Sequence, residues 1–178
     1  MVLTGSPILG ADPVQLIRWG ANYSPGIHQG QYWRLVTSMF IHIGVLHLAF
    51  NMWAFWNLGQ LTEALLGRGR FLAMYLVSGI AGSALSYLLH PAGLSAGASG
   101  AIFGVAGALI AVLRFAHLGV PSHAVKPVLR SVVSFAGYNL LIGAVVPQIN
   151  NIAHFGGLLA GFLLGLGVAL QRRPQEIH

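Results

Sequence analysis

Four polar side chains that could do chemistry stand inside otherwise apolar stretches of the sequence. Ser99 is the only hydroxyl-bearing residue in "GASGAIFG", and His154 stands in "NIAHFGG". His47 and Asn51 are four residues apart, a spacing that places both on one face of a helix. A serine hydroxyl becomes a nucleophile when an adjacent base accepts its proton. The residue types therefore indicate nucleophilic catalysis by Ser99 if the fold brings His154 beside it.

Other chemistries are disfavoured by the surrounding residues. "GASGA" is not the G-x-S-x-G turn of α/β-hydrolases, because Ala101 stands where the second glycine would be and no strand precedes it. The sequence has no cysteine, no H-E-x-x-H motif, and only three acidic residues, Asp12, Glu63 and Glu176. We therefore expect no metal site and no cofactor. With so few carboxylates, Ser99 and His154 would act as a dyad without the acidic member of a triad.

The composition indicates that the protein lies in lipid. Of the 178 residues, 56% are hydrophobic and 7% are charged, whereas soluble proteins carry about 25% charged residues. The net charge of +6 comes from basic residues that stand between the apolar segments rather than in one patch. This pattern favours anionic lipid headgroups over nucleic acid as the partner.

Five segments are long and apolar enough to cross a bilayer, which takes about 20 helical residues. We expect an all-α, polytopic bundle with helices over residues 41–62, 71–90, 98–116, 127–147 and 152–170. Residues 1–10 are too short to span, so they are the end of a sixth helix or a lead-in. Residues 11–40 have no clean period and read as an interfacial first loop. The chain, 1–178, is expected to be one membrane domain with a five-helix core over 41–171 and a cytoplasmic tail over 172–178.

The distribution of Lys and Arg predicts the orientation. If the five spans alternate, one side of the membrane carries Arg68, Arg70, Arg114, Lys126, Arg130, Arg172 and Arg173. Only Arg18 and Arg34 fall on the other side. The side with seven charges is cytoplasmic by the positive-inside rule, so the loops 90–97 and 146–151 are external. The helices that carry the four polar residues all enter from that external side.

Glycines predict how Ser99 and His154 meet. They recur at spacings of three and four around each of the two residues: Gly97, Gly100, Gly104 and Gly107, then Gly157, Gly161 and Gly165. Small residues at these spacings let helices approach closely in lipid. An isolated membrane serine more often bonds the carbonyl four residues back, as we expect for Ser83 and Ser86. Ionisable groups in a membrane are costly and indicate function, and here they gather at one depth.

With these residues in view, the sequence resembles the rhomboid family of intramembrane serine proteases. The resemblance covers nearly the whole chain from about Trp33. It rests on "WRLVTSMFIHIGVLHLAFN" (33–51), "GASGAIFG" (97–104) and "NNIAHFGGLLAG" (150–161), which occur in this order and at this spacing.

The resemblance implies roles for five residues. Ser99 matches the nucleophile of the family and His154 its general base. His47 and Asn51 match residues that line the oxyanion hole together with the Ser99 backbone N–H. Gly97 matches the position that lets the loop backbone approach the oxyanion.

Four further positions match with smaller roles. His42 matches a histidine near the membrane surface and is expected to support the site. Trp33 and Arg34 match a structural pair in the first loop. Phe103 stands where one common form of the pattern has tyrosine, so it can pack beneath Ser99 and His154 without donating a hydrogen bond. The family core has six spans, whereas this sequence displays five and a short lead-in.

The expected function is cleavage of transmembrane protein substrates near the external interface, in a bacterial plasma membrane. The partners are the substrates and the bilayer, with no nucleic acid, and the sequence does not predict an oligomeric state. One alternative is a non-catalytic rhomboid-like protein of the derlin or pseudoprotease kind, although those lack the Ser/His pair. Another is a small proton-relay transporter, which the absence of buried carboxylates and of an inverted repeat disfavours.

Overall fold

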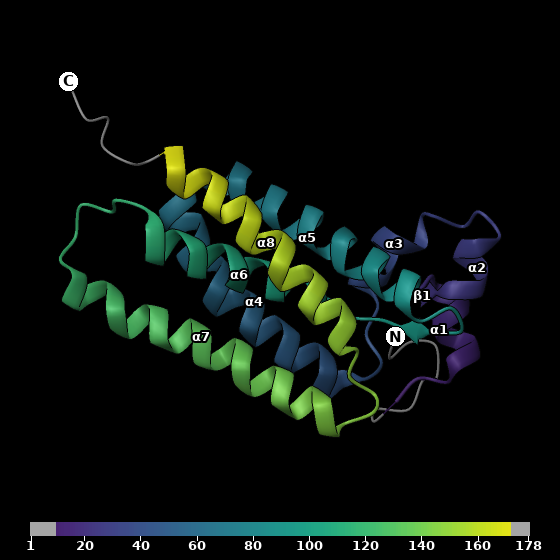
Figure 1. The fold of residues 1–178 in the computed structure, drawn as a ribbon. Coiled ribbons are helices and arrows are strands. Elements are labelled where there is room, and N and C mark those ends of the chain that lie inside the picture. Colours follow the sequence, from purple (N-terminus) through teal and green to yellow (C-terminus); the bar gives the residue numbers. More distant parts are fainter. Residues whose placement is uncertain (1–9, 172–178) are drawn as a thin grey trace.

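The structure is a computed structural model that describes residues 10–171. The predicted N-terminal segment, apart from Gly10, and the predicted tail over 172–178 lie outside the described residues. The five predicted spans are all helical: α4 (Val45–Leu66), α5 (Arg68–Leu89), α6 (Ser99–Phe115), α7 (Ser122–Val145) and α8 (Asn151–Gln171). Figure 1 shows these helices running side by side, so the predicted all-α bundle is confirmed.

The five helices differ in whether they are long and apolar enough to cross a membrane. The helices α5, α7 and α8 are each long and apolar enough to cross a membrane, and α4 qualifies together with the short helices that precede it. The fifth helix, α6, has 17 residues and is shorter than a full span. It is buried along almost its whole length by the other helices. The predicted helices are therefore present, while a count of five full spans stays a prediction.

The first loop contains more regular structure than the sequence suggested. Its elements are α1 (Pro13–Trp19), β1 (Asn22–Tyr23), α2 (Ser24–His28), α3 (Arg34–Thr37) and the 3₁₀ helix η2 (Ser38–Phe40). Each is too short to produce a detectable period, which is why the range 11–40 was predicted as irregular. They lie together at one end of the bundle (Figure 1).

Arg34 fastens this loop. Its guanidinium donates hydrogen bonds to Gln31 Oε1 (2.6 Å), to the Ile17 carbonyl (2.8 Å) and to the Ala21 carbonyl (3.1 Å). The same group lies over the Trp33 ring, 4.5 Å from its centroid. The side chain is only 6% exposed. Three satisfied donors and a cation–π contact offset the cost of burying a charge.

The predicted start of the first span, at residue 41, is wrong. The chain bends by 94° between the α3–η2 segment and α4, and α4 begins only after Gly44. The bend does not interrupt the apolar run in the sequence. Met39, just before the bend, packs in the core and is 2% exposed. His42 therefore lies in the connecting segment, and His47 lies in the first turn of α4.

The helices α6 and α8 are in backbone contact. A Cβ added to Gly157 would overlap the carbonyl oxygen of Gly100, and one added to Gly161 would overlap that of Gly104. One added to Gly165 would lie 2.5 Å from the Ala108 carbonyl oxygen. The predicted close approach of these two helices is confirmed, since no larger side chain fits at the crossing.

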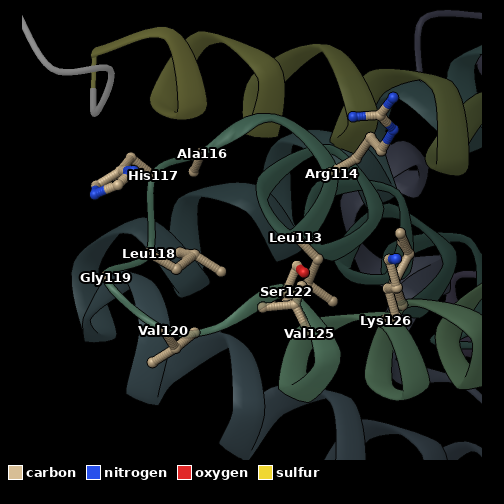
Figure 2. A pocket seen from close by; sticks show the side chains of 11 residues that line it. Leu113, Arg114, Ala116, His117, Leu118, Gly119, Val120, Ser122, Val125 and Lys126 are labelled. Atoms are coloured by element: carbon tan, nitrogen blue, oxygen red, sulfur yellow. The ribbon is translucent and has the colours of Figure 1, made fainter.

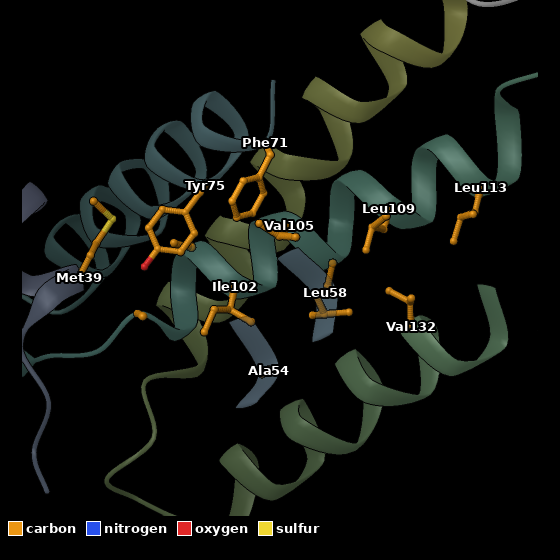
Figure 3. Packing of buried hydrophobic residues seen from close by; sticks show 13 residues of the cluster. Met39, Ala54, Leu58, Phe71, Tyr75, Ile102, Val105, Leu109, Leu113 and Val132 are labelled. Atoms are coloured by element: carbon orange, nitrogen blue, oxygen red, sulfur yellow. The ribbon is translucent and has the colours of Figure 1, made fainter. Parts of the chain in front are cut away.

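Apolar side chains fill the space between α6 and its other neighbours. Figure 3 shows Ile102, Val105 and Leu109 of α6 among Phe71 and Tyr75 of α5, Leu58 of α4 and Val132 of α7. A two-stranded antiparallel sheet joins the first loop to the segment before α6: Asn22 pairs with Ser95 and Tyr23 with Leu94 of β2 (Leu94–Ser95). The end of the bundle that holds the first loop is thus tied directly to the chain leading into Ser99.

Candidate active site

Ser99 and His154 meet at the end of the bundle that holds the first loop. Ser99 is the first residue of α6, and His154 lies in the first turn of α8. The Nε2 atom of His154 is 2.8 Å from Ser99 Oγ, a hydrogen-bond distance. His154 is 6% exposed. The glycine crossing of α6 and α8 makes this distance possible, because each residue stands just before the point of closest approach.

Phe103 fixes the plane of the His154 ring. The two rings are stacked, with centroids 4.3 Å apart and planes inclined by 7°. Phe103 stands one turn after Ser99 on α6, so the same helix supplies the hydroxyl and the platform beneath the imidazole. The ring of Phe103 also packs against the ring of Phe135 of α7, with the ring centroids 6.0 Å apart. Phe103 thus packs against the face of the His154 ring, and its part in the site stays a prediction.

The Nδ1 atom of His154 is buried and has no hydrogen-bond partner among the described residues. A Ser-His-Asp triad places a carboxylate at this position. Asp12 and Glu63, the acids of the described chain, lie elsewhere: Asp12 caps α1, and Glu63 pairs with Arg68 at the opposite end of the bundle. In this geometry aromatic stacking, rather than a carboxylate, orients the imidazole.

Gly97 permits a close approach of the backbone to His47. The φ angle of Gly97 is 140°, in the region that L-residues rarely adopt. A Cβ at this position would lie 2.7 Å from His47 Cε1 and 3.7 Å from Ser99 Oγ. The Gly97 N–H donates to the Ser38 carbonyl at 3.0 Å. The first loop therefore fixes Gly97, just before Ser99, through this backbone hydrogen bond.

His47 and Asn51 lie together on α4, as their spacing predicted. The Asn51 amide donates to the His47 carbonyl at 2.8 Å. The Ile43 N–H donates to Nδ1 of His47 at 3.4 Å. A neutral His47 that accepts at Nδ1 carries its proton on Nε2, and a Cβ at Gly97 would lie 3.0 Å from that nitrogen. His47 thus presents a donor to the space beside Gly97.

His42 reaches the same cluster from the connecting segment before α4. Its ring meets the His47 ring edge to face, with centroids 5.3 Å apart. Its Nε2 accepts a hydrogen bond from the Ala98 N–H at 3.4 Å. His42 therefore contacts the residue that directly precedes Ser99. Arg34 instead donates to the Ile17 carbonyl of α1, and the Trp33 ring lies against its guanidinium.

Sequence reasoning missed a row of polar residues behind the site. Ser83 and Ser86 were expected to bond carbonyls of their own helix, but their hydroxyl groups contact other segments. Ser83 Oγ lies 3.3 Å from Ser38 Oγ, and Ser86 Oγ accepts from the Asn150 amide at 2.5 Å. The signal that could have been used is Asn150 itself, because asparagine directly before a helix is a preferred N-cap.

A hollow lies at the opposite end of the bundle from Ser99 and His154. Figure 2 shows it between the end of α6 and the start of α7, where Leu113, Leu118 and Val125 contribute apolar walls and Arg114 and Lys126 contribute charge. Ser99 and His154 do not line it. No group of three or more His, Asp or Glu side chains that could hold a metal ion occurs within residues 10–171.

The fold and the site define a class: a helical membrane protein with a serine hydroxyl hydrogen-bonded to a histidine at one end of its bundle. The family model of the Rhomboid domain matches residues 29–171. The chain belongs to the rhomboid family and is an integral, multi-pass membrane protein.

Curated relatives share this domain. The chain is 40% identical over 157 residues to Rhomboid protease GluP of Bacillus subtilis (strain 168), an alignment that covers 88% of this chain and 30% of that protein. It is 36% identical over 171 residues to RHOMBOID-like protein 1 of Arabidopsis thaliana, covering 96% and 43%. It is 35% identical over 155 residues to Putative rhomboid protease YdcA of Bacillus subtilis (strain 168), covering 86% and 75%. The chain thus spans less than half the length of the first two relatives.

Proposed function

We propose that this chain is an intramembrane serine endopeptidase that uses Ser99 as nucleophile and His154 as general base. The observation that carries the proposal is the 2.8 Å separation of Ser99 Oγ and His154 Nε2. At that distance the imidazole can accept the hydroxyl proton directly. The two relatives from Bacillus subtilis that are named as rhomboid proteases support the same reaction class.

The reaction proceeds through an acyl-enzyme. As Ser99 Oγ attacks the carbonyl carbon of the scissile bond, its proton passes to His154 Nε2. The tetrahedral intermediate collapses when His154 gives that proton to the leaving amine, and the C–N bond breaks. A water molecule then attacks the ester, again losing a proton to His154, and the carboxylic product leaves as Ser99 regains its hydrogen.

Three N–H donors are assigned to the oxyanion of the intermediate. They are the Nε2–H of His47, the second N–H of the Asn51 amide and the backbone N–H of Ser99. One Asn51 N–H bonds the His47 carbonyl, and the amide carries a second N–H that can donate to the oxyanion. Removing one such donor typically costs about 10²–10³ in rate, so Asn51→Ala is expected to be slow but measurable.

The substrate is a transmembrane segment cut near its external end. A helical backbone is already hydrogen-bonded, so the segment must unwind locally to offer its carbonyl to Ser99. Small or helix-breaking residues near the external interface should therefore favour cleavage. We place the protein in a bacterial plasma membrane, with Ser99 and His154 toward the external face, and assign no cofactor to the reaction.

The test uses the purified chain in detergent, a fluorophosphonate probe and a single-span reporter protein. Wild type should be labelled and should cleave the reporter, whereas Ser99→Ala should do neither. Ser131→Ala is the matched control, because it removes an exposed hydroxyl from α7, and it should behave as wild type. Cleavage by Ser99→Ala would overturn the proposal. Reporter binding without cleavage or labelling in wild type would favour the non-catalytic alternative.

A further inference from the structure

Asn150 makes contacts in two directions at the start of α8. Its side-chain oxygen accepts a hydrogen bond from the Ala153 N–H at 3.0 Å, and its carbonyl accepts one from the His154 N–H at 3.2 Å. Its amide nitrogen donates to Ser86 Oγ of α5 at 2.5 Å. Asn150 therefore caps the turn that carries His154 and attaches that turn to a neighbouring helix.

Next to this attachment, α5 and α8 approach each other closely. A Cβ added to Gly82 of α5 would lie 2.5 Å from the Ala153 carbonyl oxygen, and one added to Gly156 of α8 would lie 3.1 Å from the Gly82 Cα. Backbones this close gain van der Waals contact. The Leu85 side chain also lies against this contact, because a Cβ at Gly156 would be 3.0 Å from Leu85 Cδ2. The hydrogen bonds of Asn150 add directional contacts at the end of the helix, and these orient the first turn of α8.

The other side of the site is attached to the same part of α5. Ser38 Oγ contacts Ser83 Oγ at 3.3 Å, and the Ser38 carbonyl accepts from the Gly97 N–H at 3.0 Å. Ser83 and Ser86 are three residues apart, so they lie on the same face of α5, and both are buried. One short stretch of α5 thus contacts Ser38, which holds the segment before Ser99, and the turn that carries His154.

We propose that Asn150, held by Ser86, is a positioning residue for His154 and sets the distance between His154 Nε2 and Ser99 Oγ. The expected change in reaction rate rests on the proposed function, whereas the effect on the distance between the two side chains does not. The asparagine touches no reacting atom and acts through the backbone of the first turn of α8. A displacement of about 1 Å at reacting groups can lower a rate by up to about 10²-fold. Loss of one of several attachments should cost less, about tenfold.

The test compares Ser86→Ala with Ser78→Ala. Both remove one buried hydroxyl from α5, but Ser78 Oγ has no partner among the described residues whereas Ser86 Oγ bonds Asn150. We expect Ser86→Ala to lower both kcat for the reporter and the rate of fluorophosphonate labelling about tenfold, with KM unchanged. Ser78→Ala should match wild type in all three. Asn150→Ser keeps an N-cap oxygen and loses the amide donor, so it should resemble Ser86→Ala.

A second readout does not depend on activity. The ¹⁵N resonance of His154 Nε2 reports its hydrogen bond to the serine hydroxyl, and its value without that bond is given by Ser99→Ala. In Ser86→Ala the resonance should move toward that value, and in Ser78→Ala it should not. An unmoved resonance in Ser86→Ala, or equal kinetics for Ser86→Ala and Ser78→Ala, would overturn the positioning role. A wild type that neither labels nor cleaves would overturn the proposed function instead.

Discussion

Helices α6 and α7 follow one another in the chain and are packed in opposite ways. All but a few residues of α6 are buried, whereas α7 buries only Val132 and Ala136. On α7, Tyr138 and Leu141 are each 67% exposed, and such surface faces lipid in a membrane protein. The helix that carries Ser99 is thus surrounded by protein, and its successor is mostly surrounded by lipid.

The difference follows from side-chain size. Glycine and alanine along α6 let α8 approach to backbone contact, which places Ser99 and His154 within hydrogen-bond reach. On α7, Tyr138, Leu141 and Val145 are exposed. Its contacts with the site are the ring of Phe135 on Phe103 and the Leu140 carbonyl, which accepts a hydrogen bond from Asn151 in the first turn of α8. The site therefore depends on close backbone packing on one side and on a few side-chain contacts on the other. Four substitutions test this contrast.

The largest effect is expected where backbones touch. A valine at Gly161 would drive its Cβ into the Gly104 carbonyl oxygen, so α6 and α8 must separate and Ser99 must leave His154. Gly161→Val should abolish cleavage and labelling and lower the melting temperature in detergent. Gly167→Val on the same helix is the control, because a Cβ there meets nothing within 4 Å. Normal labelling of Gly161→Val would show that the crossing is not required.

A smaller loss is expected at the loop before Ser99. Gly97→Ala adds a Cβ 2.7 Å from His47 Cε1 at a φ of 140°, so it combines a clash with backbone strain of about 1–3 kcal/mol. We expect kcat/KM to fall about 100-fold and the melting temperature to fall by a few degrees. Gly30→Ala also places alanine at a positive φ, 92°, but with open space around the new Cβ. Equal losses in the two variants would mean that strain, and not the approach to His47, is responsible.

A further step down is expected at the ring beneath His154. An aromatic pair contributes about 0.5–1.5 kcal/mol beyond its area, and 1.36 kcal/mol corresponds to tenfold in rate. Phe103→Leu should therefore lower kcat by up to about tenfold. Phe162→Leu, which removes an aromatic contact with Phe115 instead, should leave kcat unchanged. The idea that stacking orients the imidazole fails if both variants turn over at the wild-type rate.

The smallest effect is expected on the lipid-facing surface of α7. Leu141→Ala removes a side chain that is 67% exposed, and substitutions at such positions usually change stability by less than about 0.5 kcal/mol. The melting temperature and the labelling rate should both remain at wild-type values. A clear loss of either would mean that α7 is packed more closely than the described contacts indicate.

The sequence predicted the helices better than it predicted the first loop. Long apolar runs identify α5, α7 and α8 because hydrophobicity is a local property of each segment. The range 11–40 contains four short helical elements and a strand. Each is too short for its hydrophobic period to be detected in the sequence. Their arrangement depends on Arg34, whose three acceptors come from positions 3, 13 and 17 residues away.

Residue type and spacing by themselves determined the apolar helices, the glycine spacing that lets α6 and α8 touch, and the identity of the two residues that meet there. Tertiary structure alone decided the 94° bend that moves His42 out of α4. It also decided the hydrogen bonds that Ser83 and Ser86 of α5 make on either side of the site. The physical reason is range: a helix is specified by neighbours a few residues apart, whereas a hydrogen bond between Ser86 and Asn150 joins groups 64 residues apart and exists only once the helices have packed.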